Sequence, residues 1–259
     1  VTGVQTCALP ISGGLGDITF LDPVSWNSAF ALTVTSSNNI VVSGMISNAG
    51  AGNITLNANV AAAGSITINS NITTGGSITA LANRDLTLAN PATLTTGAAG
   101  ALSLRAAGAS TAGTGNLSLL GNLSVGTGNL TLLSGVNGTR PSFTATTTNL
   151  VPQSNFGTTS ITGFNDLTID RNFTGTGSIT LTAMRDLTLN ATRTITPGAA
   201  GAVSLNAANA LSAGVGNFNW NGIISMGTGA LTTVSGANGT RPSFTLTAAN
   251  LLGGTMGAI

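Results

Sequence analysis

The sequence predicts an all-β chain that coils into a right-handed parallel β-helix, or β-solenoid, with about 20 to 25 residues in each rung. Three observations predict this fold class. Short segments alternate apolar and polar residues, these segments follow one another too closely for helices to lie between them, and a long stretch recurs without a gap 101 residues later. Such a chain repeats one small unit along an axis.

The alternation consists of an apolar residue, Thr or Ser, and a second apolar residue, preceded by Gly, Asn, Asp or Ser. Clear examples are Ile54-Thr55-Leu56, Ile66-Thr67-Ile68, Leu86-Thr87-Leu88, Leu117-Ser118-Leu119 and Leu130-Thr131-Leu132. A period of two places the apolar side chains on one face of a strand, and no segment shows the 3.6-residue stripe of an amphipathic helix. We therefore expect short, half-buried strands along the whole chain.

These strands follow one another at short intervals, and only 5% of the residues are charged. An antiparallel sheet with a solvated face usually carries Lys and Glu there, whereas a solenoid can cover itself with ladders of Thr, Ser and Asn. The composition thus favours a solenoid, of about ten or eleven rungs at ~4.8 Å each. The pairs expected to face its core are Ile66/Ile68, Leu86/Leu88, Leu102/Leu104, Leu167/Ile169 and Leu187/Leu189.

An internal duplication organises the chain. Residues 76–143 align with residues 177–244 at about 40 of 68 positions, which predicts a repeated unit of four or five rungs. We expect one solenoid over residues 12–259, with the two copies at about 64–151 and 165–252. Residues 1–11 differ in composition, resemble translated sequencing-adapter read-through and are treated as a non-native leader, so the chain is expected to be a piece of a longer protein.

Twin irregular segments, residues 134–150 and 235–251, each join an Asn-Gly turn to an Arg-Pro step. Because loops on a rigid scaffold often carry binding chemistry, we expect an adhesive surface there, formed by Arg140, Phe143, Arg241 and Phe244 with the Phe side chains exposed. The alternative is that each Phe closes the end of a rung.

The composition excludes much chemistry. The chain has seven Arg, six Asp and one Cys (Cys7), it lacks Lys, Glu and His, and its net charge is +1. No basic face for nucleic acid, no phosphate-binding loop and no metal-ligand spacing is present, and no apolar run is long enough for a spanning helix. We expect no enzyme activity, no cofactor, no metal, no nucleic-acid partner and no transmembrane segment.

One carboxylate pair requires attention because parallel β-helices also occur in polysaccharide lyases and hydrolases. Asp166 and Asp186 are 20 residues apart, so a 20-residue rung would place them about 5 Å apart, in the range of retaining glycosidases. The alternatives are that each Asp lies at a corner or is balanced by Arg171 or Arg185. The pair is not duplicated, since Ser65 stands at the position equivalent to Asp166.

Arg84 and Arg185 directly precede Asp85 and Asp186 in the sequence. On a strand, sequence neighbours point to opposite faces, so we expect no ion pair within either Arg-Asp dipeptide.

The strings GNITLNANV (52–60), GSITINSNITTGGSIT (64–79) and WNSAFALTVTSSNNIVVSGMI (26–46) resemble the repeat region of filamentous-haemagglutinin-like exoproteins. These are large bacterial surface adhesins exported by two-partner secretion. The resemblance implies an extracellular or outer-membrane-surface location, a secretion partner, and the role of a non-enzymatic shaft that contacts glycan or protein on a host or neighbouring cell.

Two alternatives remain beside the shaft interpretation: a polysaccharide-acting β-helix enzyme and an ice-binding solenoid. Thr-x-Thr phrases at residues 33–35, 144–148 and 245–247 resemble ice-binding arrays, which need paired Thr columns in successive rungs, but these phrases lie about a hundred residues apart. N-x-[ST] triplets occur at Asn53, Asn71, Asn116, Asn122, Asn129, Asn137, Asn172, Asn190 and Asn238. We interpret these triplets as products of the strand pattern rather than as glycosylation sites.

Overall fold

The protein is a parallel β-solenoid in a computed structural model that describes residues 16–58, 64–106, 115–135, 141–151, 155–207, 216–235 and 251–253. These residues contain strands and corners and no helix. In order, the strands are β1 (Ile18–Phe20), β2 (Val24–Trp26), β3 (Leu32–Thr35), β4 (Ile40–Val42), β5 (Ile46–Asn48), β6 (Ile54–Ala58), β7 (Ile66–Ile68), β8 (Ile72–Thr74), β9 (Ile78–Ala82), β10 (Leu86–Leu88), β11 (Thr93–Thr95), β12 (Leu102–Arg105), β13 (Leu117–Leu119), β14 (Asn122–Ser124), β15 (Leu130–Leu133), β16 (Phe143–Thr146), β17 (Leu150–Val151), β18 (Thr159–Phe164), β19 (Leu167–Asp170), β20 (Phe173–Thr174), β21 (Ile179–Ala183), β22 (Leu187–Leu189), β23 (Thr194–Thr196), β24 (Val203–Asn206), β25 (Phe218–Trp220), β26 (Ile223–Met226), β27 (Leu231–Val234) and β28 (Leu251–Gly253).

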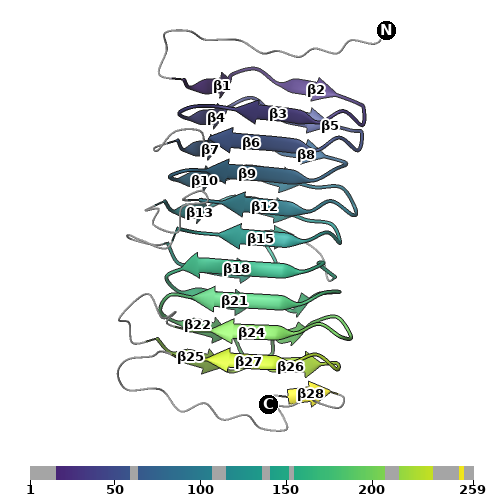
Figure 1. Ribbon diagram of the computed structural model, residues 1–259, viewed down its shortest axis with the longest axis vertical. Helices are drawn as coiled ribbons and strands as arrows, with labels where there is room; N and C mark the ends of the chain where they lie inside the picture. Colours follow the sequence, from purple (N-terminus) through teal and green to yellow (C-terminus); the bar gives the residue numbers. More distant parts are fainter. Residues whose placement is uncertain are drawn as a thin grey trace.

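Every turn of the coil contributes three strands, one to each of three faces, and all strand pairs are parallel. One face is a continuous nine-stranded sheet in the order β27-β24-β21-β18-β15-β12-β9-β6-β3. In Figure 1 its strands lie in front and run from right to left while the sequence colours descend from purple to yellow, so the coil is right-handed. The predicted fold class is confirmed.

Turn length varies more than the sequence predicts. Leu86 is in register with Ile66 in the turn before it and with Leu117 in the turn after it, and the second of these turns is about half as long again as the first. The nine strands of the continuous sheet are joined by eight full turns in the described part of the chain. The nine strands represent nine rungs among the described residues, against ten or eleven expected for the chain, and turns as long as the one from Leu86 to Leu117 account for the lower number.

The interior is a stack of aliphatic side chains. All ten residues predicted to face inward are at most 2% exposed, from Ile66 to Leu189. The register brings like positions together, so that Ile66, Leu86 and Leu117 form one column through three turns. Burying each such side chain contributes roughly 1.5 to 3 kcal/mol to stability. Aliphatic stacking therefore holds together a chain with few ion pairs.

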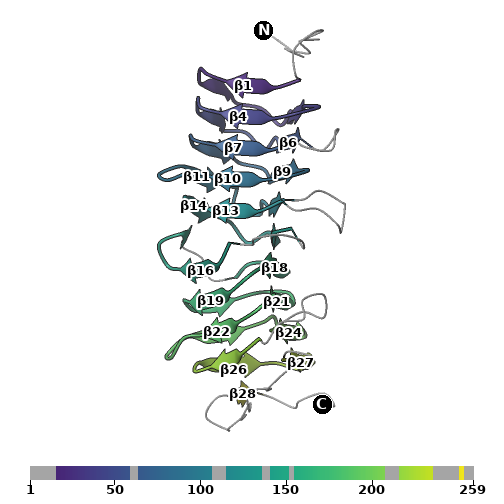
Figure 2. The ribbon, with the colours of Figure 1, turned by 90° about the vertical axis from the view of Figure 1, so that its left-hand side faces the viewer.

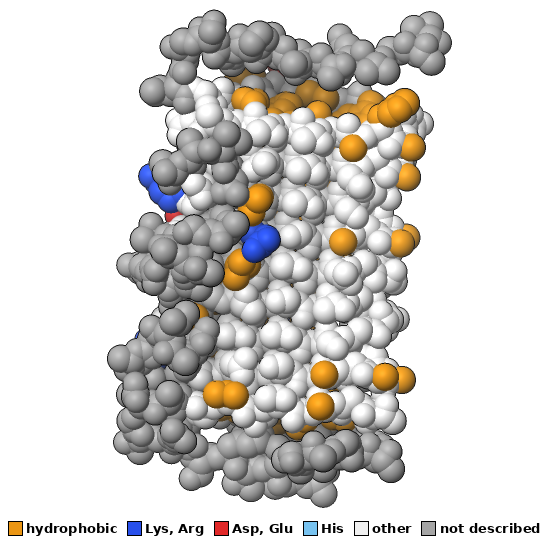
Figure 3. Space-filling view, viewed as in Figure 1, with side chains coloured by type: hydrophobic (Ala, Val, Ile, Leu, Met, Phe, Trp, Pro, Cys, Tyr) orange, Lys and Arg blue, Asp and Glu red, His pale blue; other side chains and the backbone are white. Residues whose placement is uncertain are grey.

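The continuous sheet presents a column of hydroxyl groups to solvent. The column consists of Thr33, Thr55, Thr79, Ser103, Thr131, Ser160, Thr180, Ser204 and Thr232, each in register with the next. Figure 3 shows this face, which we call the flat wall, as a largely uncharged surface. Its regularity follows from the period-two alternation repeated in register at every turn.

The two copies of the duplication have the same strands. Each strand from β7 to β15 begins 101 residues before its counterpart among β19 to β27, for example Ile66 before Leu167 and Leu130 before Leu231. Four turns lie between β7 and β19, which agrees with the lower of the two predicted values.

Two of the three faces are interrupted on either side of one turn, the turn that contains β16, β17 and β18. One sheet ends at β13 and another begins at β16, and on the next face one sheet ends at β17 and another begins at β20. Figure 2 shows the discontinuity between β13 and β16. Two ring pairs pack near this sheet break: Phe143 with Phe164 at 5.1 Å between centroids, and Phe156 with Phe173 at 5.2 Å. Aromatic packing fills the core where the ladders of two faces are interrupted.

Candidate functional site

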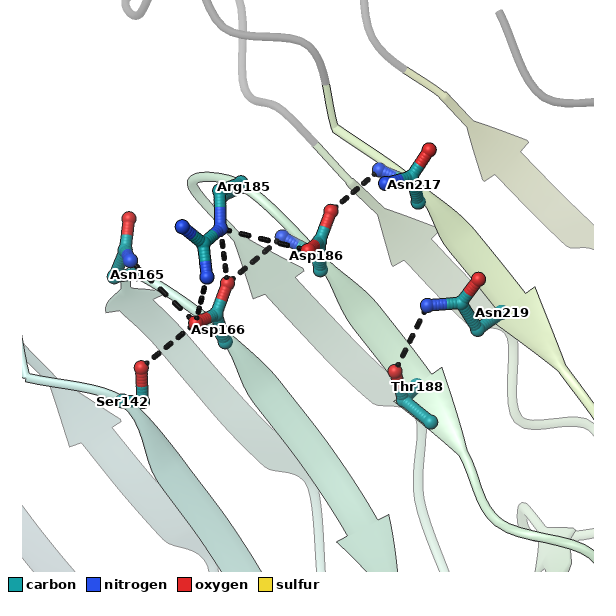
Figure 4. A network of polar contacts seen from close by, with 8 residues as sticks. All are labelled: Ser142, Asn165, Asp166, Arg185, Asp186, Thr188, Asn217 and Asn219. Carbon is teal, nitrogen blue, oxygen red and sulfur yellow. Dashed lines mark hydrogen bonds and ion pairs between the residues drawn. The ribbon is translucent and has the colours of Figure 1, made fainter.

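The carboxylate pair identified in the sequence lies at a corner of the coil. Asp166 and Asp186 directly precede β19 and β22, and these strands pair with Leu167 opposite Leu187. Both Asp side chains are about a quarter exposed, at 24% and 25%. The two residues therefore occupy equivalent corner positions in adjacent turns, as their spacing in the sequence predicts (Figure 4).

Arg185 lies between the two carboxylates. Its Nε and Nη2 donate to Oδ1 and Oδ2 of Asp166 at 2.7 and 2.6 Å, and its Nε lies 3.4 Å from Oδ2 of Asp186. Of the two arginines proposed to balance the pair, Arg185 is the one that does so. Arg171 is buried instead, with its guanidinium carbon 5.7 Å from the centroid of the Phe156 ring.

Further hydrogen bonds occupy the carboxylates. Asp166 accepts from Ser142 Oγ at 2.9 Å, from Asn165 Nδ2 at 3.5 Å and from the backbone N–H of Asp186 at 3.4 Å. Asp186 accepts from the backbone N–H of Asn217 at 2.8 Å. The network connects successive turns of the coil at this corner, as Figure 4 shows.

The electrostatics of Asp166 oppose a role as a general acid. Burial raises the pKa of this carboxyl, but hydrogen bonds from Arg185 and Ser142, together with the charge of Arg185, hold it below the ordinary value of 3.8. A glycosidase acid requires the opposite shift, so that it is protonated near neutral pH. Asp166 is therefore ionised at neutral pH and can act as an acceptor and counter-ion.

The first copy builds the same corner without a second carboxylate. Ser65 Oγ accepts from the backbone N–H of Asp85 at 3.4 Å, and Asp85 accepts from the backbone N–H of Asn116 at 2.9 Å. These bonds repeat those of Asp166 and Asp186 in the second copy. The corner geometry thus requires an acceptor in each turn and does not require a carboxylate pair.

The prediction about the Arg-Asp dipeptides is wrong. Arg84 Nε lies 3.0 Å from Asp85 Oδ2, and Arg185 contacts Asp186. Both dipeptides lie at corners before β10 and β22 rather than within strands, so the opposite-face rule for strand neighbours does not apply.

Acid is expected to weaken the fold through Asp166. A carboxylate whose pKa is lower in the folded state stabilises the protein above its unfolded pKa, and this contribution is lost as the pH falls through the folded pKa. The stability gap between the parent and Asp166→Asn should be largest at neutral pH and shrink as the pH falls below the ordinary carboxyl pKa of 3.8 and through the lower folded-state pKa. Urea unfolding at several pH values measures the gap, with the exposed Asp22→Asn as control. A gap for Asp166→Asn that does not change with pH would contradict the assignment.

The adhesive surface expected in the twin segments needs a correction. Phe143 is 5% exposed and not exposed as predicted, because β16 is a regular strand that places Phe143 opposite the buried Leu167. Its ring packs on Phe164 in the core, which matches the alternative of a Phe that closes a rung. Arg140, Arg241 and Phe244 lie outside the described residues.

Several sequon asparagines hold corners together. The side-chain oxygens of Asn53, Asn71, Asn129 and Asn172 accept from backbone N–H groups of the next turn at 2.8 to 3.0 Å. This role explains why asparagine recurs before Ile-Thr and Leu-Thr strands. Asn137 and Asn238 lie outside the described residues.

The sequence did not reveal the hydroxyl column of the flat wall, because the turns differ in length and its members therefore do not recur at a fixed spacing. The second outward column of the same strands is mixed: it runs Thr35, Asn57, Leu81, Arg105, Leu133, Thr162, Thr182, Asn206 and Val234. Paired Thr columns in successive turns, which an ice-binding array needs, are therefore not formed on this wall. Sequence reasoning also missed the ion pair of Arg193 with Asp170, whose atoms are 3.0 Å apart across one turn.

The described residues contain no group of three or more Cys, Asp, Glu or His side chains that could hold a metal ion. Within the same residues, no helix is long and apolar enough to cross a membrane. Comparisons with protein-family models, with curated proteins and with solved structures found no match.

Proposed function

We propose that the chain is a non-enzymatic shaft segment of a large secreted bacterial surface adhesin, which displays contact regions at a distance from the cell. The observation that carries the proposal is the continuous coil: eight turns of parallel strands with an aliphatic core and an unbroken hydroxyl column on one wall. Such a structure supplies length, which is the property that a shaft needs.

The hydrogen bonds support a mechanical role. Strands of adjacent turns pair along the coil axis, so a pull along the axis loads many ladder bonds at each turn. The corner contacts of Arg185 with Asp166 and of Asn53 with Ser77 add side-chain bonds in the same direction. At the corner that holds Asp166 and Asp186, the carboxylates accept hydrogen bonds that join adjacent turns. This supports a structural role for the two carboxylates rather than a catalytic one.

The proposal predicts a lack of polysaccharide cleavage. Incubation with a panel of neutral and acidic polysaccharides should produce no new reducing ends and no unsaturated products, because Asp166 is held ionised by Arg185. Reducing-sugar assays and absorbance of unsaturated uronates measure the two reaction types. Reproducible cleavage that disappears in Asp186→Asn would replace the proposal by a β-helix enzyme.

The proposal also places the protein on the cell surface, which can be tested separately. Antibodies raised against the purified chain should label intact cells that express the native gene, and shearing of those cells should release the antigen. Antigen found only after cell lysis would contradict a surface shaft.

A further inference from the structure

One patch interrupts the hydroxyl chemistry of the flat wall. In the second outward column, Arg105 of β12 is in register with Leu81 of β9 on one side and with Leu133 of β15 on the other. All three side chains are partly exposed. Figure 3 shows one blue side chain with orange ones above and below it on the left part of the largely pale wall. We call Leu81, Arg105 and Leu133 the wall patch.

Arg105 has no acidic partner among the described residues. The other arginines on the described surface, Arg84, Arg185 and Arg193, each form an ion pair. The Nε of Arg105 is buried without an acceptor, while its side chain as a whole is partly exposed. Among the described residues the wall patch therefore holds a cation without a counter-ion between two apolar side chains, where the lower local dielectric strengthens its attraction for an anion.

The second copy shows that the fold does not need this patch. The first outward column is identical in the two copies, because Thr79, Ser103 and Thr131 correspond to Thr180, Ser204 and Thr232. The wall patch differs at all three positions: the second copy has Thr182, Asn206 and Val234. There Asn206 Nδ2 donates to Thr182 Oγ1 at 3.3 Å. The same strands therefore form with two polar residues and a valine at these positions, so the fold does not depend on the Leu-Arg-Leu arrangement of the wall patch.

We propose that the wall patch binds a carboxylate-bearing polysaccharide. The planar guanidinium of Arg105 can donate two parallel hydrogen bonds to one carboxylate. On the same strands, two residues earlier, the hydroxyls of Thr79, Ser103 and Thr131 form a straight row about 7 Å from the wall patch. A linear chain of acidic sugars can place a carboxylate on Arg105, apolar C–H groups on the leucines and hydroxyls along the row.

This proposal goes beyond the shaft function, because it assigns a ligand to the wall of one copy. A shaft without this site would still be a shaft, so surface labelling and the cleavage panel are independent of its outcome.

Affinity electrophoresis of the full chain through gels that contain polygalacturonate tests the proposal. We expect retardation of the parent that is absent with dextran, and a loss of affinity of about tenfold in Arg105→Asn, which installs the residue of the second copy. Thermal unfolding of the variant checks that the coil is intact. Arg84→Asn removes the same charge from an ion-paired position one turn away and should change the affinity by less than about twofold.

A gain-of-function variant provides a second test that does not depend on a loss of polysaccharide affinity. The double change Asn206→Arg and Val234→Leu places an arginine beside an exposed leucine in the second copy and leaves the buried Thr182 in place, and it should add a second binding site. Equal retardation by dextran, equal loss in Arg84→Asn, or no added binding in the double variant would overturn the proposal. Tighter retardation by dextran sulfate than by polygalacturonate would also overturn it, since the charge alone would then decide binding.

Discussion

Replacing Phe143 by alanine is expected to lower the free energy of unfolding by about 3 to 5 kcal/mol. The ring is 5% exposed and packs on Phe164 at 5.1 Å between centroids, in the turn where the sheet of β16 begins and the sheet of β17 ends. A cavity at this position removes ring contacts in a part of the coil that has fewer backbone bonds between turns. Urea unfolding followed by circular dichroism at a β-sheet wavelength measures the loss.

Phe30→Ala is the matched control, because Phe30 is 73% exposed. Its effect on the free energy of unfolding should stay within about 0.5 kcal/mol, because alanine keeps the backbone carbonyl that accepts from Trp26 Nε1. Similar small effects for both variants would show that Phe143 lies at the surface and would restore the adhesive interpretation of that side chain.

Gly97→Ala is expected to destabilise the protein by at least about 3 kcal/mol. A Cβ at Gly97 would collide with the backbone carbonyl oxygen of Gly75, in the preceding turn. Because Gly97 also donates its N–H to the carbonyl of Gly76 at 2.9 Å, neither backbone segment can move away without breaking ladder bonds. The second copy has glycine at the same position, Gly198, whose Cβ would collide with the carbonyl of Thr176.

Gly175→Ala is the control for a corner glycine with space. The nearest atom to its added Cβ is Ile179 Cγ1 at 3.4 Å, an ordinary contact, and the equivalent position in the first copy carries Thr74. Its unfolding free energy should stay within about 1 kcal/mol of the parent value. If both glycine variants unfold at the same urea concentration, close backbone stacking at Gly97 is not a constraint on this fold.

Much of the fold and part of the site could be predicted. The alternation around Ile66 and Leu86 correctly identified residues of the core, because successive side chains of a strand point to opposite faces and the pattern is therefore local. The spacing of Asp166 and Asp186 also correctly placed the two carboxylates in adjacent turns. The same local rule failed for Arg84 and Asp85, because it holds within strands and these residues lie at a corner.

The sequence by itself determined the fold class, the residues that face the core and the 101-residue repeat, because each follows from patterns carried by neighbouring or duplicated residues. Only the tertiary structure decided that Phe143 packs inside, that Arg185 joins two turns, and that Arg105 lies between Leu81 and Leu133. These facts depend on the register between turns. Because the turns differ in length, as the turns from Ile66 to Leu86 and from Leu86 to Leu117 do, that register is set by corners and loops, which the strand pattern does not encode.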